Sequence, residues 1–220
     1  MALPGNYILN KRKDNMARSR NTKKENVWAD ERIGRTENGQ IRLPRIIVRH
    51  PAHGDIHPLS RKFISRALRT IPVEYLYGLT HIELRARQGK QIGKPFGKYR
   101  SSEKAIILYS LPMNWVIDEL AIGPRENMEA FGAEVVCKED GWHVHWPSKA
   151  SIGVWYFTEV LTHELGHHFA EQYKKKRGRI RGHRFAELNA ELHSCRLTRE
   201  LFNRVRRRRQ ERAKISEQKA

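Results

Sequence analysis

The chain of 220 residues carries 43 Lys and Arg residues against 24 Asp and Glu residues, which gives a formal net charge of +19. This length favours one domain of ordinary size with tails, and no apolar run approaches the roughly 18 residues of a membrane-spanning helix. Cys137 and Cys195 are too few for a disulfide framework, and the N-terminal apolar stretch is too short for a secretory signal, so we expect a cytoplasmic protein. Both cysteines are expected to be small core residues.

Charge and hydropathy divide the chain into three parts. Residues 1–40 are polar, basic and aperiodic, so we expect a flexible arm. Residues 41–203 contain the apolar segments and should form the folded domain. The tail at 204–220 is rich in arginine, and residues 171–220 together hold 17 Lys and Arg against 6 Asp and Glu. Such a block attracts polyanions, so it predicts either a contact with nucleic acid or a solvated helix end without a partner.

The first half of the domain alternates short apolar strands with amphipathic helix patterns. A helix should follow Ser60, which can cap it, because Phe63, Ile64 and Leu68 fall on one helical face. The continuous apolar segment Ala105–Tyr109 indicates a buried strand. The other expected elements are a strand from Ile41 to Val48, a strand over His81–Arg87, a loop punctuated by Gly89, Gly93 and Gly97, and a helix over Leu111–Phe131 in two pieces, broken at Gly123-Pro124.

The second half opens with the strongest local signal for secondary structure. The dipeptide Asp140-Gly141 separates two short apolar segments and is typical of a tight β-hairpin. A helix should follow over residues 151–176, capped by Ser151, and the final helix should begin near Arg184. This order of elements predicts an α+β fold with a mixed sheet and a β-hairpin.

Two groups of histidines are weaker candidates for function. His143 and His145 share one face of the second hairpin strand, which is typical of the polar outer face of a sheet; metal or substrate binding is the alternative. His50, His53 and His57 form a loop cluster without helical or zinc-finger spacing, so we expect them at the surface.

The motif that carries chemistry is His163-Glu164-Leu165-Gly166-His167, which has the form HExxH. Residues four apart lie on one face of a helix, so His163 and His167 can offer two imidazole nitrogens to one tetrahedral Zn²⁺. Glu164 lies beside them, where it can accept a proton from water without binding the metal. The alternative is a buried histidine pair that is satisfied by hydrogen bonds.

A catalytic zinc site needs three protein ligands, so the third must come from elsewhere in the chain. Glu187 follows His167 by twenty residues on the expected final helix, and Glu191 lies one turn further on the same face. Their neighbours include the apolar residues Leu188 and Leu192, so we expect both carboxylates to point toward the core. Two buried carboxylates are unfavourable unless a cation neutralises them. We therefore expect Glu187 to bind zinc and Glu191 to accept the ring N–H of a ligand histidine. The alternative places both on the solvated flank of an amphipathic helix.

This arrangement resembles the gluzincin branch of the zinc metallopeptidases, in which a later helix supplies Glu in a Glu-x-x-Ser/Ala-Asp/Glu context. The chain reads ELNAE at 187–191, and the match covers residues 160–192. The resemblance implies a zincin-like fold in which the active-site helix is followed by a Glu-bearing helix. The roles that it implies are metal ligands at His163, His167 and Glu187, general base and acid at Glu164, and an outer carboxylate at Glu191.

Two related branches make different predictions. A metzincin would have Gly and His where this chain has Ala170 and Tyr173, so that branch is excluded. The SprT-like proteases, which are associated with DNA-bound protein substrates, take a third histidine from a loop after the motif helix, and His183 lies at a tolerable distance. The usual continuation of their motif is absent, because Arg184 follows directly. If Glu187 is the ligand, His183 is instead a candidate oxyanion donor or a surface histidine.

The sequence therefore predicts an intracellular zinc metallopeptidase that hydrolyses a protein or peptide substrate. Zn²⁺ would activate water and polarise the scissile carbonyl, and Glu164 would pass the proton to the leaving amine. The strand Ala105–Tyr109 could pair with an extended substrate. Two alternatives stay open: a SprT-like, DNA-associated protease, and a non-enzymatic basic protein that binds nucleic acid or supports assembly and holds a structural zinc. No contact with a membrane is expected.

Overall fold

The computed structural model describes residues 43–87, 95–177 and 183–217, all of which belong to the unit formed by residues 33–220. The arm predicted at 1–40 lies outside the described residues. The described part of the chain combines helices with two β-sheets, and the predicted α+β class is confirmed.

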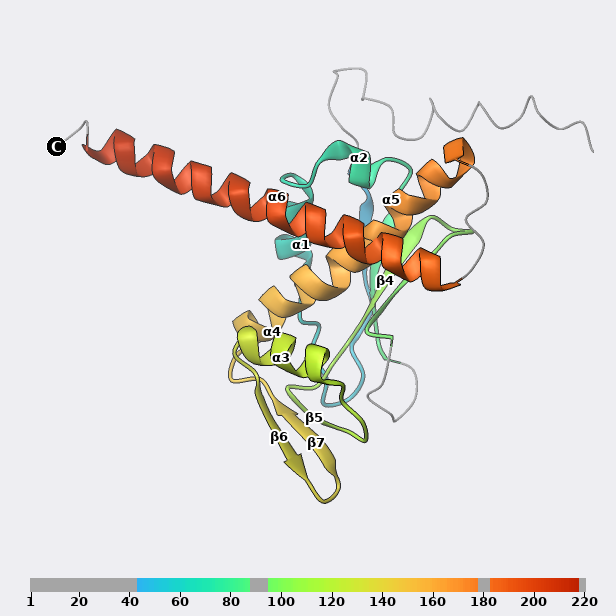
Figure 1. The fold of residues 1–220 in the computed structure, drawn as a ribbon, viewed down its shortest axis with the longest axis vertical. Coiled ribbons are helices and arrows are strands. Elements are labelled where there is room, and N and C mark those ends of the chain that lie inside the picture. Colours follow the sequence, from blue (N-terminus) through green and yellow to red (C-terminus); the bar gives the residue numbers. More distant parts are fainter. Residues whose placement is uncertain (1–42, 88–94, 178–182, 218–220) are drawn as a thin grey trace, which may run out of the picture. The chain divides into compact units, whose positions relative to one another are not determined.

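Figure 1 shows how these elements are arranged. The strands are β1 (Arg45–Val48), β2 (His81–Arg85), β3 (Gly97–Arg100), β4 (Ala105–Tyr109), β5 (Asn114–Ile117), β6 (Glu134–Lys138) and β7 (Gly141–His145). The helices are α1 (Arg61–Leu68), α2 (Val73–Leu76), α3 (Ile122–Ala130), α4 (Lys149–Trp155), the π-helical segment η1 (Tyr156–Leu161), α5 (Thr162–Arg177) and α6 (His183–Glu217). None of the helices within the described ranges combines the length and the apolar composition that crossing a membrane requires.

The larger sheet has four strands in the order β1-β2-β4-β3. The first three run parallel, and β3 pairs antiparallel with β4 at the edge. All residues of β4 are buried, as expected for a central strand with both faces covered. Because β4 already has a hydrogen-bonded neighbour on each side, it cannot pair with a substrate, so the prediction that Ala105–Tyr109 does so is wrong. The strand at that edge is β3, which falls where the sequence predicts a loop around Gly97.

The smaller sheet has the order β5-β7-β6, and its strands pair antiparallel. The predicted hairpin is present as β6–β7, but its turn residues are Glu139 and Asp140, one position before the predicted dipeptide. Gly141 begins β7, where it pairs with Lys138 and takes a φ of +124°, which favours glycine. The strand β5 corrects the prediction of a helix over this part of the chain. Trp115 is buried and its neighbour Val116 is exposed, an alternation that is typical of a strand. The second of the two predicted helical pieces corresponds to α3, which begins at Ile122 and therefore includes Gly123-Pro124, where the sequence predicts a break.

The segments α4, η1 and α5 form one helical run that carries the HExxH motif at the beginning of α5. Its cap is Ser148 rather than the predicted Ser151, because the Ser148 hydroxyl accepts a hydrogen bond from the backbone N–H of Ser151 at 3.1 Å. The π-helical segment ends directly before the motif. An extra residue in a π-turn rotates the side chains that follow relative to those before it, and such turns are frequent at functional sites.

The helix α6 crosses α5 (Figure 1) and packs on it through small residues. Ala190 and Ser194 are buried at this contact, and the hydroxyls of Ser194 and Thr162 lie 2.6 Å apart. The two backbones approach most closely at Gly166, where a Cβ atom would collide with the carbonyl oxygen of Ala190. The glycine of the motif is therefore what allows α6, and the glutamates on it, to come close to α5.

We expect Gly166→Ala to lower the free energy of unfolding by about 1–3 kcal/mol, because the added methyl group has to push the α6 backbone away from α5. Urea unfolding followed by circular dichroism measures the change. The same variant should bind metal more weakly than the wild type, since Glu187 lies on α6 one turn before Ala190. An unchanged unfolding midpoint would contradict the close packing of the two helices.

The outward face of α6 corrects two predictions. Leu188 and Leu192, expected beside a core-facing surface, are 54% and 59% exposed. Cys195 on the same helix and Cys137 on β6 are exposed as well, so neither cysteine is a core residue. The residues of α6 that face the core are Ala190, Ser194, Leu197 and Leu201. Close packing against α5 leaves room only for small side chains at the first two of these positions, and an argument from large apolar residues therefore selects the wrong face.

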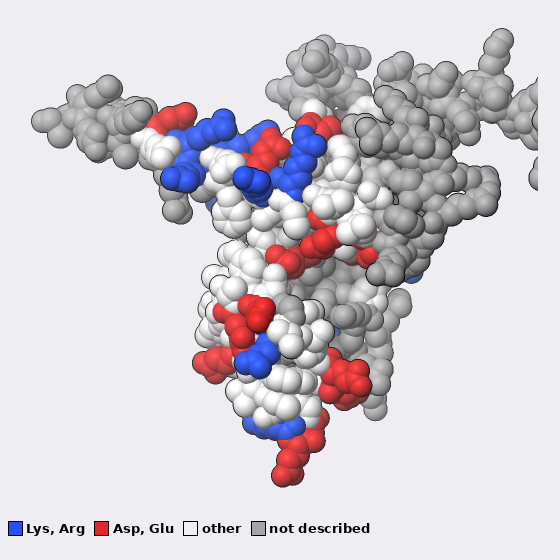
Figure 2. Space-filling model, in the orientation of Figure 1, with Lys and Arg blue, Asp and Glu red and all other residues white. Residues whose placement is uncertain are grey.

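The helix α6 continues into the predicted tail at 204–220. Lys and Arg side chains gather along it in Figure 2, and Arg206 and Arg207 are exposed. Arg204 forms an ion pair with Glu200 at 2.5 Å and donates a hydrogen bond to the carbonyl oxygen of Thr70 at 2.9 Å. The arginines of this part of the tail are therefore presented on a helix.

Candidate metal centre

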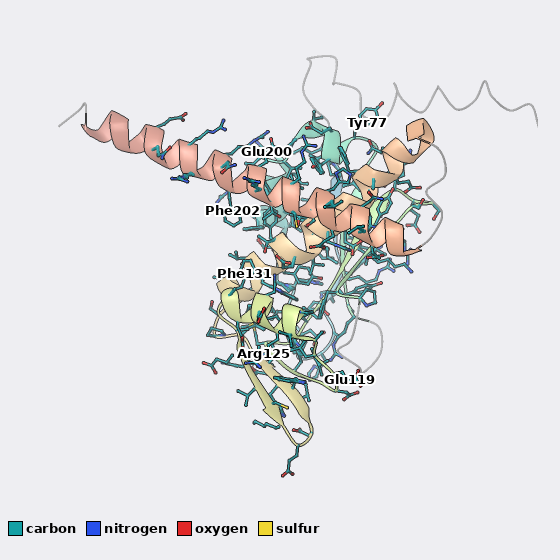
Figure 3. All side chains as sticks on the ribbon, in the orientation of Figure 1. Tyr77, Glu119, Arg125, Phe131, Glu200 and Phe202 are labelled. Atoms are coloured by element: carbon teal, nitrogen blue, oxygen red, sulfur yellow. The ribbon has the colours of Figure 1, made fainter. Side chains whose placement is uncertain are left out.

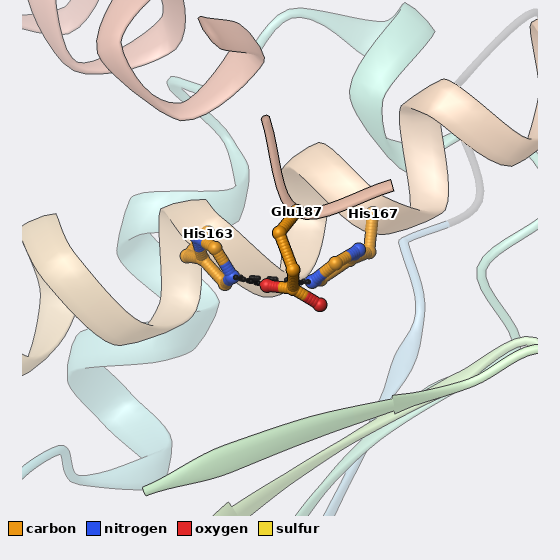
Figure 4. Close-up of side chains that lie close together, drawn as sticks. All are labelled: His163, His167 and Glu187. Atoms are coloured by element: carbon orange, nitrogen blue, oxygen red, sulfur yellow. Dashed lines mark hydrogen bonds and ion pairs between the residues drawn. The ribbon is translucent and has the colours of Figure 1, made fainter. Parts of the chain in front are cut away.

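The helices α5 and α6 bring together three side chains of the kinds that bind metals (Figure 4). The Nε2 atoms of His163 and His167 lie 3.1 Å apart. The Oε2 atom of Glu187 lies 3.3 Å from the first of these nitrogens and 3.5 Å from the second. The two histidines come from successive turns of α5, and the carboxylate reaches them from the beginning of α6, as the sequence predicts.

The spacing of these three atoms fits a tetrahedral zinc ion. Zinc binds histidine nitrogen and carboxylate oxygen at about 2.0–2.2 Å, so two ligand atoms at a tetrahedral angle lie about 3.3–3.5 Å apart. The two separations from Glu187, 3.3 and 3.5 Å, fall in that range, and the separation of the two histidine nitrogens, 3.1 Å, is slightly shorter. Two imidazoles and one carboxylate are also the donor set of hydrolytic zinc sites, which keep a fourth position for water or substrate.

Glu191 lies behind one of the candidate ligands. Its Oε2 atom is 3.3 Å from Nδ1 of His163, the ring nitrogen that faces away from Glu187. A proton on Nδ1 is donated to this carboxylate and leaves Nε2 with a lone pair for a metal. The side chains of Glu187 and Glu191 are 44% and 59% exposed. They lie at a solvent-accessible rim, so the prediction that they point toward the core is wrong.

Glu164 is buried beside the cluster and is held by β3. Its Oε2 atom accepts a hydrogen bond from the backbone N–H of Tyr99 at 2.6 Å. Burial raises the pKa of Glu164 to about 7, although His163 and the Tyr99 N–H both favour the charged form. A carboxyl group with a pKa near 7 can both accept and return a proton at neutral pH. The arrangement therefore suits a general base and acid.

The residues of β3 that hold Glu164 are those that the sequence argument missed. Gly97 passes so close to α5 that a Cβ atom there would lie 2.8 Å from a methyl carbon of Val160 and 3.1 Å from Cγ of Glu164. Glycine is therefore required at this position by tertiary packing and not by a turn. The alternation around Tyr99, over a strand of four residues, was the only sequence signal for β3, and it is weak.

A cavity of about 900 Å³ opens beside the three candidate ligands. One side is formed by the edge strand β3 with Tyr99, and another by α3, α4 and η1 with Asn127, Trp155 and Glu159. The helix α3 is held to the hairpin by Arg125, labelled in Figure 3, whose guanidinium carbon lies 5.3 Å from the centre of the Trp142 ring. The cavity is large enough for several residues of an extended peptide.

His168, the third histidine of the HELGHH segment, has a structural role that its sequence position does not reveal. It is fully buried, with Nε2 2.7 Å from the carbonyl oxygen of Tyr77 and Nδ1 3.2 Å from the hydroxyl of Tyr99. Burial lowers the pKa of His168 to about 4, so the ring is neutral at pH 7. It ties α5 to β3 and to the end of α2, and so fixes the helix that carries His167.

We expect the titration of His168 to lower the free energy of unfolding as the pH falls from 6.5 to 4, whereas Glu164, whose pKa is raised in the folded state, acts in the opposite direction. The pKa of His168 is lower in the folded state than in the unfolded state, so the unfolded chain binds more protons throughout this window. The loss at pH 4 is up to about 3 kcal/mol of the free energy of unfolding. Urea unfolding of the metal-free protein at several pH values measures it. Relative to the wild type, His168→Gln should become more stable as the pH falls through this window, because only the opposing effect of Glu164 remains. The control His53→Gln, at an exposed histidine, should keep the pH dependence of the wild type.

The other histidines considered from the sequence are not part of this cluster as far as the structure describes them. His143 and His145 lie on the outward face of the hairpin, where Nε2 of His143 is 2.7 Å from Oδ1 of Asp140. His57 donates a hydrogen bond from Nε2 to the carbonyl oxygen of Arg49 at 2.7 Å. The side chain of His183, the alternative ligand or oxyanion donor, is outside the part of the chain that the structure describes.

Comparison with known proteins adds no relative: no family model, no curated protein and no solved structure matches this chain. The geometry of the candidate metal centre is therefore the basis on which a function can be assigned.

Proposed function

We propose that the protein is a zinc-dependent metallopeptidase. The observation that carries the proposal is the convergence of His163, His167 and Glu187, at separations that suit one zinc ion, beside the buried carboxyl group of Glu164. The cavity of about 900 Å³ at this cluster supplies the space that a peptide needs. A purely structural zinc site would be expected to have four protein ligands and no adjoining cavity.

The residues around the cluster have distinct tasks in this reaction. His163, His167 and Glu187 would hold the zinc ion, which would supply a Lewis acid able to polarise a carbonyl group and to lower the pKa of water toward about 7. Glu164 accepts the proton of the attacking water on the carboxylate oxygen that the Tyr99 N–H does not engage, and delivers it to the leaving amine. Glu191 holds the tautomer of His163.

The edge strand β3 is the element that we propose to align the substrate. Its inner edge pairs with β4, and its outer edge borders the cavity at Gly97 and Tyr99. An extended peptide can add to an exposed sheet edge through main-chain hydrogen bonds. The Tyr99 N–H on this edge already orients Glu164, so a peptide added next to it at Gly97 would lie beside the general base.

The experiment that tests the proposal combines metal analysis with a cleavage assay. The purified protein should contain one zinc ion per chain and should cleave an unstructured protein such as denatured casein. A chelator should remove both the ion and the activity, and added zinc should restore both. A protein that binds zinc but cleaves none of a broad set of peptides would favour the non-enzymatic alternative.

A DNA-associated protease is the second candidate, and exposed arginines on α6 such as Arg206 and Arg207 support it. In the SprT-like form of this alternative, His183 rather than Glu187 completes the metal site. The position of Glu187, within 3.5 Å of both histidine nitrogens, favours the first candidate.

A further inference from the structure

One wall of the cavity carries a carboxyl group that the proposed hydrolysis does not use. Glu159 lies on η1, one turn before His163, and its half-buried side chain lines the cavity. Asn127 lies beside it: Nε1 of Trp155 donates a hydrogen bond to Oδ1 of Asn127 at 3.0 Å, and the amide of Asn127 favours the charged form of Glu159, which lowers the pKa of that carboxyl against the larger effect of burial.

The charge of the cavity is opposite in sign to the charge of the chain. Four glutamates line it, Glu159, Glu164, Glu187 and Glu191, whereas Lys98 is the only Lys or Arg among its described lining residues. A divalent cation bound by His163, His167 and Glu187 would still leave an excess of negative charge. Figure 2 shows Asp and Glu side chains gathered below α6, on a face where Lys and Arg follow the helix itself. In a protein with a net charge of +19, such a cavity attracts cations selectively.

Apolar as well as polar side chains surround Glu159. Met128 and Trp155 line the same cavity, and both are almost completely buried. A lysine or arginine side chain has an aliphatic stem and a charged end. Such a side chain could lay its stem against Met128 and Trp155 and place its charge on Glu159. An acidic side chain would meet the same carboxylate with repulsion.

The distance between Glu159 and the metal ligands indicates how far from the scissile bond the residue bound by Glu159 would lie. One turn of helix, about 5.4 Å, separates it from His163, and successive residues of an extended peptide are about 3.3 Å apart. The substrate residue that reaches Glu159 therefore lies within about two positions of the scissile bond.

We propose that this cavity selects basic protein segments, and that Glu159 binds the side chain of a lysine or arginine within about two positions of the scissile bond. Cleavage at that bond rests on the proposed peptidase function, whereas the binding of a basic side chain does not. Glu159 is thus a specificity-determining residue, and its carboxylate forms a charge-assisted hydrogen bond with the bound cation.

The first test uses pairs of peptides that are otherwise uncharged and differ at one position, which is either lysine or norleucine. When the varied residue is the one that reaches Glu159, the kcat/KM of the lysine peptide should exceed that of the norleucine peptide by about tenfold or more. In Glu159→Gln this ratio should fall close to one. The control Glu126→Gln removes an exposed carboxylate of α3 that does not line the cavity, and should keep the ratio. Equal cleavage of both peptides, or a ratio that survives Glu159→Gln, would overturn the proposal.

The second test does not need turnover. The zinc-loaded Glu164→Gln variant, which cannot act as a base, is titrated with the same fluorescently labelled peptides, and the anisotropy is measured. The lysine peptide should bind about tenfold more tightly than the norleucine peptide, and the further change Glu159→Gln should abolish the difference. If the wild type cleaves no peptide but this preference is present, the peptidase function fails and the basic ligand stands. If the preference is absent, the inference itself is wrong.

Discussion

Glu164→Gln should lower the kcat of peptide hydrolysis by about 10²–10⁴-fold while the zinc content stays at one ion per chain. The amide of glutamine has almost the same shape as the carboxylate, and its oxygen can still accept the hydrogen bond from the Tyr99 N–H. It cannot accept a proton from water. Glu164 is not one of the three clustered ligand residues, so the metal should remain. Peptide cleavage and elemental analysis of the same preparation measure both quantities.

The control for this variant is Glu126→Gln, the same exchange at an exposed site outside the cavity, which should have wild-type rates. Normal cleavage by Glu164→Gln would remove this residue from the mechanism. Loss of zinc from the variant would show instead that Glu164 supports the metal site.

Glu187→Ala should weaken zinc binding by more than about 100-fold, because it removes one of three ligands from the site. Loss of a residue that only supports a ligand typically costs 10–100-fold. Glu191→Ala, which removes the carboxylate behind His163, should fall in that smaller range. Competition with a chromophoric chelator measures the three affinities, and peptide cleavage at saturating zinc shows whether the activity returns.

The same measurement separates the two kinds of metallopeptidase. In the SprT-like alternative, His183→Ala strips the metal, and Glu187→Ala leaves it in place. In the arrangement proposed here the two results are exchanged. A wild-type affinity in Glu187→Ala would contradict the proposed ligand set directly.

The sequence predicts best where a short spacing determines the geometry. The 3.6-residue period of a helix places His163 and His167 on one face wherever the helix lies. Asp140-Gly141 determines its hairpin in the same local way, through the backbone angles that glycine permits. Glu187 could be found because the pattern of the following helix, at the right distance, carries carboxylates one turn apart.

The sequence argument fails where tertiary packing decides. Gly97 looks like a loop residue, but it is a glycine because the backbone of β3 passes directly against Val160 and Glu164. The contact with Tyr99 joins residues 65 positions apart in the chain, and no local pattern reports it.

The face of α6 could not be predicted for a related reason. The first half of α6 packs through Ala190 against Gly166 and so turns its smallest side chains inward. Leu188 and Leu192 then point outward, so an argument based on the size of apolar side chains gives the opposite result there. His168 was likewise missed, since a buried histidine whose partners include Tyr77 and Tyr99, far away in the sequence, leaves no spacing signature.

The division of the ligand set between α5 and α6 couples the metal to the position of a whole helix. An ion that binds only when both helices are docked stabilises their association in proportion to the logarithm of its concentration. Consider a ligand that binds the arginine-bearing half of α6 with an affinity that depends on this docking. Thermodynamic reciprocity requires that the ligand changes the protein's affinity for the ion by the same factor by which the ion changes the protein's affinity for the ligand. A second binding event on this helix can thereby regulate the occupancy of the candidate metal centre without contacting it.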